Sequence, residues 1–179
     1  MYLRDNILER YPNVWVTSDF HFNHRNILKF EPRRAERWKS VEEMNDGLVE
    51  IWNAKVGSED LVLFLGDLSF TCAETVESRL NGRKILIRGN HDLRDAEFFK
   101  SFGFFKVVSV AVWGKYVFTH IPIHPDEFQW RWKINVHGHT HSRMINDPRY
   151  FNACLDGHPD FTLWNLRDDI VAKFGGKDE

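Results

Sequence analysis

The 179-residue sequence contains two cysteines, Cys72 and Cys154, which lie far apart and form no Cys-x-x-Cys pair. This scarcity argues against a disulfide framework and against a metal site built from thiolates. Both cysteines are expected to be small apolar residues of the core. Any metal site must therefore use nitrogen and oxygen donors.

The sequence also lacks an apolar run of about 18 residues, so no transmembrane helix is expected. The first eleven residues have no apolar segment of the kind that a secretory signal needs, because charged side chains interrupt them at Arg4, Asp5, Glu9 and Arg10. We therefore expect a cytoplasmic protein without a membrane partner.

Neither sign of charge is in large excess. The formal net charge is −2 and the sequence pI is about 6.5, so non-specific binding of nucleic acid is disfavoured. The sequence contains no internal repeat, low-complexity tract or linker, and its length suits one domain. The expectation is a single domain over residues 1–179.

Apolar periodicity predicts the main elements. Strands are expected at residues 14–17, 61–65, 84–88, 134–136, 150–155 and 161–164. Helices are expected at residues 41–54, 73–80, 95–102 and 166–174. A hairpin is expected to join 104–112 to 115–119. Strands and helices alternate in the first half and hairpins fill the second, which predicts two packed sheets flanked by helices.

Polar clusters follow most of these strands. Their candidate metal ligands are Asp19, His21, Asp67, Asn90, His120, His139 and His141. So many oxygen and nitrogen donors suit two adjacent divalent cations better than one structural zinc ion. Asp67 is the central candidate for a bridging carboxylate, and His91 is the candidate that donates a proton to the leaving group. The residue types thus favour a two-metal hydrolase.

The motifs occur in the order Asp-x-His, Gly-Asp, Gly-Asn-His-Asp, a lone His and Gly-His-x-His, which resembles the calcineurin-like metallophosphoesterase superfamily. The resemblance implies an α/β fold, a four-layer α/β/β/α sandwich of two mixed sheets flanked by helices. It implies that one metal is bound by Asp19, His21, Asp67 and His141, and the other by Asp67, Asn90, His120 and His139. Residues 21–28 and 42–45 further resemble small stand-alone members from bacteria and phages.

The chain departs from three branches of that superfamily. Protein Ser/Thr phosphatases and diadenosine tetraphosphate hydrolases continue the Gly-Asp motif to an arginine, which is missing after Asp67 here. Purple acid phosphatases place a tyrosine ligand where this chain has Phe70, which has no oxygen to bind iron. These classes are disfavoured, and the group that orients His91 is left open. No room remains for a cap domain, so an open site is expected.

We therefore expect a dinuclear-metal-dependent phosphoesterase that hydrolyses small phosphomonoesters or phosphodiesters, nucleotides or cyclic nucleotides among them, by attack of a metal-bridged hydroxide. Manganese is the first candidate metal, and iron, zinc and nickel also suit mixed donors. Two alternatives stay open, a nuclease and a non-catalytic protein-binding scaffold with the same fold. The sequence carries no indication of the oligomeric state.

Candidates for substrate contact are less specific. His24 and Asn26 could form a phosphate-binding turn, although a solvated helix start explains them equally well. Arg88 and Arg94 flank the acid motif. His124 competes with His120 for a place at the metal site, but His120 is favoured because it directly follows the strand.

Three neighbouring arginines form a short basic run. The run of Arg33, Arg34 and Arg37 is more typical of a solvated face than of a site for a polyanion.

Overall fold

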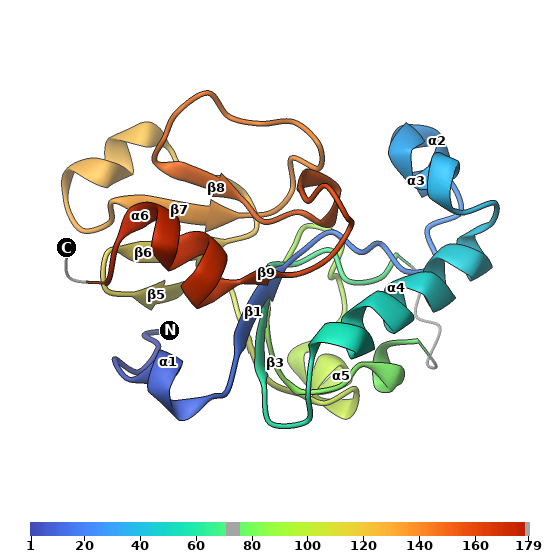
Figure 1. The fold of residues 1–179 in the computed structure, drawn as a ribbon, viewed down its shortest axis with the longest axis horizontal. Coiled ribbons are helices and arrows are strands. Elements are labelled where there is room, and N and C mark those ends of the chain that lie inside the picture. The colour runs from blue at the N-terminus through green and yellow to red at the C-terminus, as the bar shows by residue number, and fades with distance from the viewer. Residues whose placement is uncertain (71–75, 178–179) are drawn as a thin grey trace.

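The computed structural model describes residues 1–70 and 76–177 (Figure 1). The strands are β1 (Val14–Thr17), β2 (Leu61–Phe64), β3 (Arg83–Ile87), β4 (Phe104–Val108), β5 (Ala111–Trp113), β6 (Tyr116–Thr119), β7 (Ile134–His137), β8 (Tyr150–Asn152) and β9 (Trp164–Asn165). The α-helices are α1 (Ile7–Arg10), α2 (Ile27–Phe30), α3 (Pro32–Arg37), α4 (Val41–Lys55), α5 (Ala96–Ser101) and α6 (Ala172–Phe174). Short 3-10 helices are η1 (Glu77–Arg79), η2 (Pro125–Gln129) and η3 (Leu155–Gly157), and η4 (Leu166–Val171) is a π-helix.

The strands form two mixed sheets with flanking helices, which confirms the predicted fold class. The first sheet has the order β4-β3-β2-β1-β9 and the second the order β5-β6-β7-β8. Strands β1 to β4 are parallel and β9 is antiparallel to β1. In the second sheet β6, β7 and β8 are parallel and β5 is antiparallel.

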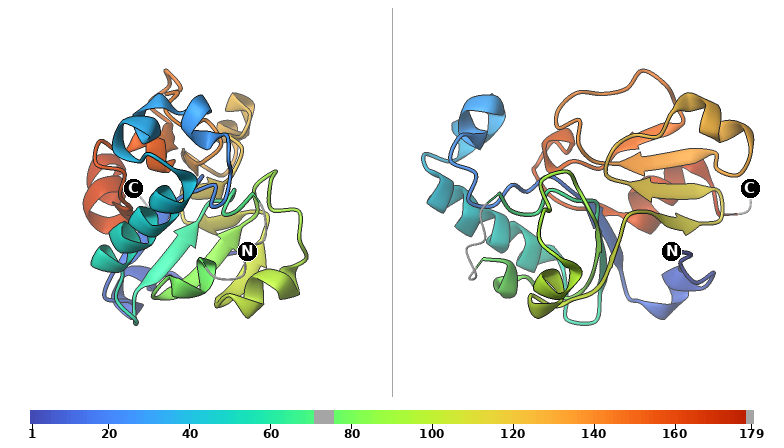
Figure 2. Two further views of the ribbon diagram at one scale, coloured as in Figure 1. Left: turned by 90° about the vertical axis from the view of Figure 1, so that its right-hand side faces the viewer. Right: turned by 180° about the vertical axis from the view of Figure 1, so that it is seen from behind.

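The first sheet is covered on both faces, as its continuous apolar strands predict. Leu63 of β2 belongs to the core between the sheets, while Phe64 belongs to the core under α4. Figures 1 and 2 show α4 and the second sheet on opposite sides of the first sheet. Helix α4 is capped by Ser40, whose hydroxyl accepts a hydrogen bond from the Glu43 amide at 3.1 Å, and the helix buries Trp52. The helix and its Ser40 cap are confirmed, while the Glu43 carboxylate accepts from the Lys39 amide at 2.7 Å rather than from Ser40.

The second sheet is covered more thinly. Phe128 of η2 packs edge-on against Tyr150 of β8, with ring centroids 5.1 Å apart. On the side that faces the first sheet, the ring of Phe151 packs against that of Phe174 of α6, with ring centroids 6.1 Å apart. Among the described residues, no helix is long and apolar enough to cross a bilayer.

Several predicted boundaries are wrong. Residues 104–112 do not form one hairpin strand, because β4 pairs with β3 in the first sheet and only β5 forms the hairpin with β6. The predicted strand 150–155 shortens to β8, the predicted strand 161–164 overlaps β9 only at Trp164, and the terminal helix begins with the π-helical turn η4. Residues 71–75, with Cys72 and the start of the predicted helix 73–80, lie outside the described residues. Cys154 is buried, as expected, but its thiol also donates a hydrogen bond to Asp19 Oδ2 at 3.1 Å.

The topology brings the polar loops to one place. Parallel strands β1, β2 and β3 end at the same edge of the first sheet, and β6 and β7 end at the neighbouring edge of the second. Backbone hydrogen bonds join these loops: the Asp19 amide donates to the Gly66 carbonyl at 2.9 Å, and the Gly138 amide donates to the His120 carbonyl at 2.9 Å. The chain therefore brings five sequence-distant loops together at one end of the two sheets.

Candidate metal centre

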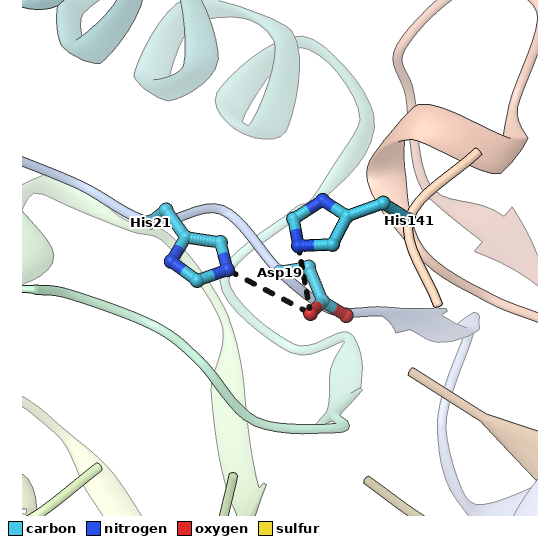
Figure 3. Close-up of side chains that lie close together, drawn as sticks. All are labelled: Asp19, His21 and His141. Carbon is cyan, nitrogen blue, oxygen red and sulfur yellow. Dashed lines mark ion pairs between the residues drawn. The ribbon is translucent and has the colours of Figure 1, made fainter. Parts of the chain in front are cut away.

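A first group of possible ligands contains Asp19, His21 and His141, which offer one atom each within 4.8 Å of one another. Both histidines direct Nε2 at the same oxygen, Asp19 Oδ1, from 3.8 Å (Figure 3). Their rings stack with centroids 5.0 Å apart. Two imidazoles and one carboxylate oxygen thus converge from loops that follow β1 and β7.

The carboxylate of Asp19 is held on one side and left open on the other. Oδ2 accepts hydrogen bonds from the Ser18 hydroxyl, from the His139 amide at 2.9 Å and from the Cys154 thiol at 3.1 Å. Oδ1 is buried and has no hydrogen-bond partner in the described part of the chain, and the same holds for both ring nitrogens of His21. Buried polar atoms without partners are costly, and a cation between Asp19 Oδ1 and His21 Nε2 would satisfy these two atoms.

A second group contains Asp67, His120 and His139, again within 4.8 Å. The His120 Nδ1 lies 2.7 Å from the Leu65 carbonyl, which can only accept, so Nδ1 carries the proton. The lone pair of Nε2 then faces Asn90 Oδ1 at 2.9 Å, His139 Nδ1 at 3.2 Å and Asp67 Oδ2 at 3.4 Å. These oxygen and nitrogen atoms are the ligand types that a divalent cation accepts, and they lie close enough together to share one.

Asp67 belongs to the second group and also lies next to the first. Its Oδ2 is 3.6 Å from His21 Nε2 of the first group and 3.4 Å from His120 Nε2 of the second. Burial alone would raise the pKa of Asp67, but without a cation a doubly protonated His120 lowers it through its hydrogen bond and charge, and the His91 amide also lowers it. An ionised carboxylate in this position suits the bridging role predicted from the sequence.

The backbone at the site departs from ordinary geometry. Five candidate ligands adopt left-handed conformations, with φ between 51° and 69°: Asp19, His21, Asp67, His139 and His141. Such conformations cost non-glycine residues about 1–3 kcal/mol each. These conformations turn the backbone out of strand geometry, so that both members of each pair, Asp19 with His21 and His139 with His141, reach the cluster. The sequence predicted this departure from the spacing of each pair.

His91 lies beside the cluster and is the most exposed of its histidines, with 40% of its side chain accessible. Its backbone amide donates to Asp67 Oδ1 at 2.9 Å, while its ring Nε2 lies 4.0 Å from Asp67 Oδ2. The rings of His21 and Phe70 lie 5.5 Å and 5.3 Å from the His91 ring. The ring is therefore positioned by packing, and it faces the open side of the site.

Asp92 has a structural role that the sequence did not reveal. Its carboxylate accepts from three backbone amides: Gly89 at 2.7 Å, Asp67 at 2.9 Å and Leu68 at 3.1 Å. It therefore ties the loop after β3 to the loop after β2. Its presence in the Gly-Asn-His-Asp motif was the one signal of this role.

Arg34 overturns the expectation of a solvated arginine face. Its side chain is fully buried, and it binds both carboxylate oxygens of Asp156, with Nε at 2.7 Å and Nη2 at 2.6 Å. Burial alone would raise the pKa of Asp156, but the charge of Arg34 lowers it to about 2. The partner lies 122 residues away, so the sequence had no local sign of this pair.

The candidate substrate contacts lie around the cluster with separate packing partners. His24 stacks on Phe70 with ring centroids 4.1 Å apart. Burial and the charge of His21 lower the pKa of His24 to about 4, so it is neutral at pH 7. Asn26 precedes α2 and makes no side-chain capping bond.

The remaining candidates stack on α5. Arg88 lies over the Phe99 ring at 5.9 Å, and Arg94 over the Phe98 ring at 4.8 Å. Substrate contact by any of these four residues stays a prediction. His120 lies in the cluster, whereas the side chain of its competitor His124 is exposed.

Comparison with known proteins gives consistent matches. The sequence profile of the calcineurin-like phosphoesterase family matches residues 12–175. An uncharacterized protein of Methanocaldococcus jannaschii is 34% identical over 144 residues, which cover 78% of this chain and 75% of that protein. The gene 66 protein of Mycobacterium phage L5 is 31% identical over 168 residues, which cover 74% of this chain and 79% of that protein. The crystal structure of a protein of unknown function from Aquifex aeolicus has the same fold, with a TM-score of 0.68, 22% identity, and coverage of 90% and 98%.

Proposed function

Because the chain belongs to the calcineurin-like phosphoesterase family, we propose that it hydrolyses small phosphomonoesters or phosphodiesters with two divalent metal ions, and that nucleotides or cyclic nucleotides are among its substrates. The convergence of Asp19, Asp67, His120 and their neighbours carries the proposal. Among the described residues, Asp19 Oδ1 and His21 Nε2 are buried without a hydrogen-bond partner, and a bound cation would satisfy both.

In this proposal Asp19, His21, Asp67 and His141 hold one ion, and Asp67, Asn90, His120 and His139 hold the other. When bound, the ions would activate water as the nucleophile and neutralise charge on the phosphate. Mn²⁺ is the first ion to test, followed by iron, zinc and nickel, because mixed nitrogen and oxygen donors accept all of them.

His91 is proposed as the acid that protonates the leaving oxygen. Its exposed ring lies next to Asp67 and has solvent access, so it can be reprotonated between turnovers. The neutral amide of Asn90 adds an oxygen ligand without negative charge, which leaves the site attractive for an anionic phosphate. A small substrate fits the modest net charge of the chain better than a long nucleic acid does.

The decisive experiment measures hydrolysis of p-nitrophenyl phosphate and bis-p-nitrophenyl phosphate with added Mn²⁺. Asp67→Asn should abolish turnover and weaken Mn²⁺ binding, because Asp67 belongs to the second group and lies next to the first. His91→Ala should keep Mn²⁺ binding and lower kcat by about 10²- to 10⁴-fold. The loss should be larger with phenyl esters than with p-nitrophenyl esters, because phenolate is a poorer leaving group and needs the proton more.

His124→Ala is the matched control, since this histidine is exposed. It should leave both turnover and Mn²⁺ binding unchanged. Absence of turnover with every metal tested would refute the enzyme and favour a protein-binding scaffold. Activity on single-stranded nucleic acid alone, with a steep salt dependence, would favour a nuclease.

A further inference from the structure

We infer that Arg34 and Asp156 are positioning residues that hold the first metal group in its binding geometry, an inference that rests on the proposed metal centre. Arg34 lies in α3, 15 residues from Asp19 and 122 residues from Asp156. Neither residue belongs to the ligand set. Both are buried directly behind it.

The guanidinium of Arg34 connects two segments of the chain. Nε and Nη2 donate to the two carboxylate oxygens of Asp156 at 2.7 Å and 2.6 Å. Nη1 donates to the Phe20 carbonyl at 2.8 Å, and Nη2 also donates to the Asp19 carbonyl. The rigid planar fork of an arginine fixes such partners relative to one another. Arg34 therefore sets the distance between the loop after β1 and the segment that contains Asp156.

Asp156 in turn orients a candidate ligand. Its Oδ2 lies 2.8 Å from His141 Nδ1, and a carboxylate can only accept, so Nδ1 carries the proton. In the neutral ring, Nε2 is then unprotonated and faces Asp19 Oδ1 at 3.8 Å. A carboxylate behind a ligating histidine fixes both the tautomer and the direction of the ring. The chain of contacts from Arg34 through Asp156 to His141 thus controls how His141 presents its lone pair.

A different assignment would make the cluster behind His141 a third cation site. Glu31 Oε1 lies 3.5 Å from His141 Nδ1, and Glu31, His141 and Asp156 form a compact group. Both oxygens of Asp156 already accept from Arg34, however, and the guanidinium places a full positive charge 2.6 Å from one of them. A further cation would be repelled there. The geometry favours orientation of His141.

The test removes the pair without leaving a buried charge. Arg34→Met combined with Asp156→Leu replaces the ion pair by apolar side chains. Proteins often fold as stably after such a replacement of a buried ion pair. Calorimetric titration of metal-free protein with Mn²⁺ should show two sites in the wild type. The folded double variant should keep one site and bind the other Mn²⁺ about 10- to 100-fold more weakly. Electron paramagnetic resonance should show loss of the spin-coupled pair at equal metal concentration.

The matched control is the surface pair of Arg149 and Asp147, which has similar bidentate geometry. Arg149→Gln combined with Asp147→Asn should leave both Mn²⁺ sites unchanged. Two sites of wild-type affinity in the folded Arg34 and Asp156 double variant would overturn the inference and leave the proposed function intact. A wild type that binds no Mn²⁺ or other divalent ion would overturn the metal centre itself.

A measurement on the wild type keeps the inference testable if the double variant does not fold. Long-range ¹H–¹⁵N spectra of metal-free protein at alkaline pH report which nitrogen of each histidine carries the proton. His141 should be the Nδ1–H tautomer because Asp156 accepts that proton. An Nε2–H tautomer of His141 would refute the positioning role.

Discussion

A single methyl group at Gly89 should displace the carboxylate that the proposed centre depends on. A Cβ at this position would lie 2.1 Å from Asp67 Oδ1 and 2.4 Å from the Asp67 amide nitrogen. Ordinary contact begins at 3.4 Å, so Oδ1 or the loop must move by about 1.3 Å. A misplacement of about 1 Å at a reacting site can cost about 100-fold in rate. Gly89→Ala should therefore lower kcat/KM for bis-p-nitrophenyl phosphate by about 100-fold and weaken Mn²⁺ binding.

The matched control for this substitution is Gly57→Ala. The nearest atom to a Cβ at Gly57 is Asp60 Oδ2 at 3.7 Å, an ordinary contact, and neither Gly57 nor Gly89 has a positive φ. Gly57→Ala should keep full activity and leave stability unchanged or raise it by about 0.4–1 kcal/mol. Wild-type activity and metal affinity in folded Gly89→Ala protein would refute the reasoning, because Asp67 would then tolerate a displaced position.

Three further predictions concern stability. Burial alone would raise the pKa of Asp60, but hydrogen bonds from Gly57, Trp15 and Asn13 lower it, so its ionised form stabilises the fold above its unfolded pKa of about 3.9. Asp60→Asn should lower the free energy of unfolding in urea by about 1–3 kcal/mol at pH 7. The difference in stability from wild type should shrink as pH falls below about 4, and a difference that stays constant down to pH 3 would contradict this. Ser40→Ala should lower the free energy of unfolding by about 1 kcal/mol, because the cap of α4 is lost. An unchanged urea midpoint would show that the cap does not stabilise the protein. Saturation with Mn²⁺ at about 100 times its Kd should add about 2.7 kcal/mol, reversed by chelator, and a thermal midpoint insensitive to Mn²⁺ would count against a folded-state metal site.

Strong local patterns made much of the fold predictable. The continuous apolar run of β2 predicted a strand buried on both faces, and Ser40 with Glu43 marked the start of α4. The segment 104–112 was not predictable in the same way. Both of its halves are suitable strand sequences, and only pairing with different partners separates β4 from β5. The local sequence of a strand does not determine which sheet the strand joins.

The candidate ligands were predictable because their residue types and order are unusual. The residues behind them were not. Arg34 is part of a basic run that resembles a solvated helix face, and its burial follows from Asp156, which is remote in sequence. Asp92 was visible in the motif, but its three amide partners depend on how the loops after β2 and β3 meet. Tertiary contacts decide such roles.

The anchoring of Asp19 Oδ2 has a consequence for how ions enter the site. Three donors prevent the carboxylate from rotating, so Oδ1 keeps one direction whether or not a cation is nearby. Folding has already met the entropic cost of arranging this donor. Uptake should then be limited by the release of water from the incoming ion, and crystals grown with and without Mn²⁺ should superimpose around Asp19 within coordinate error.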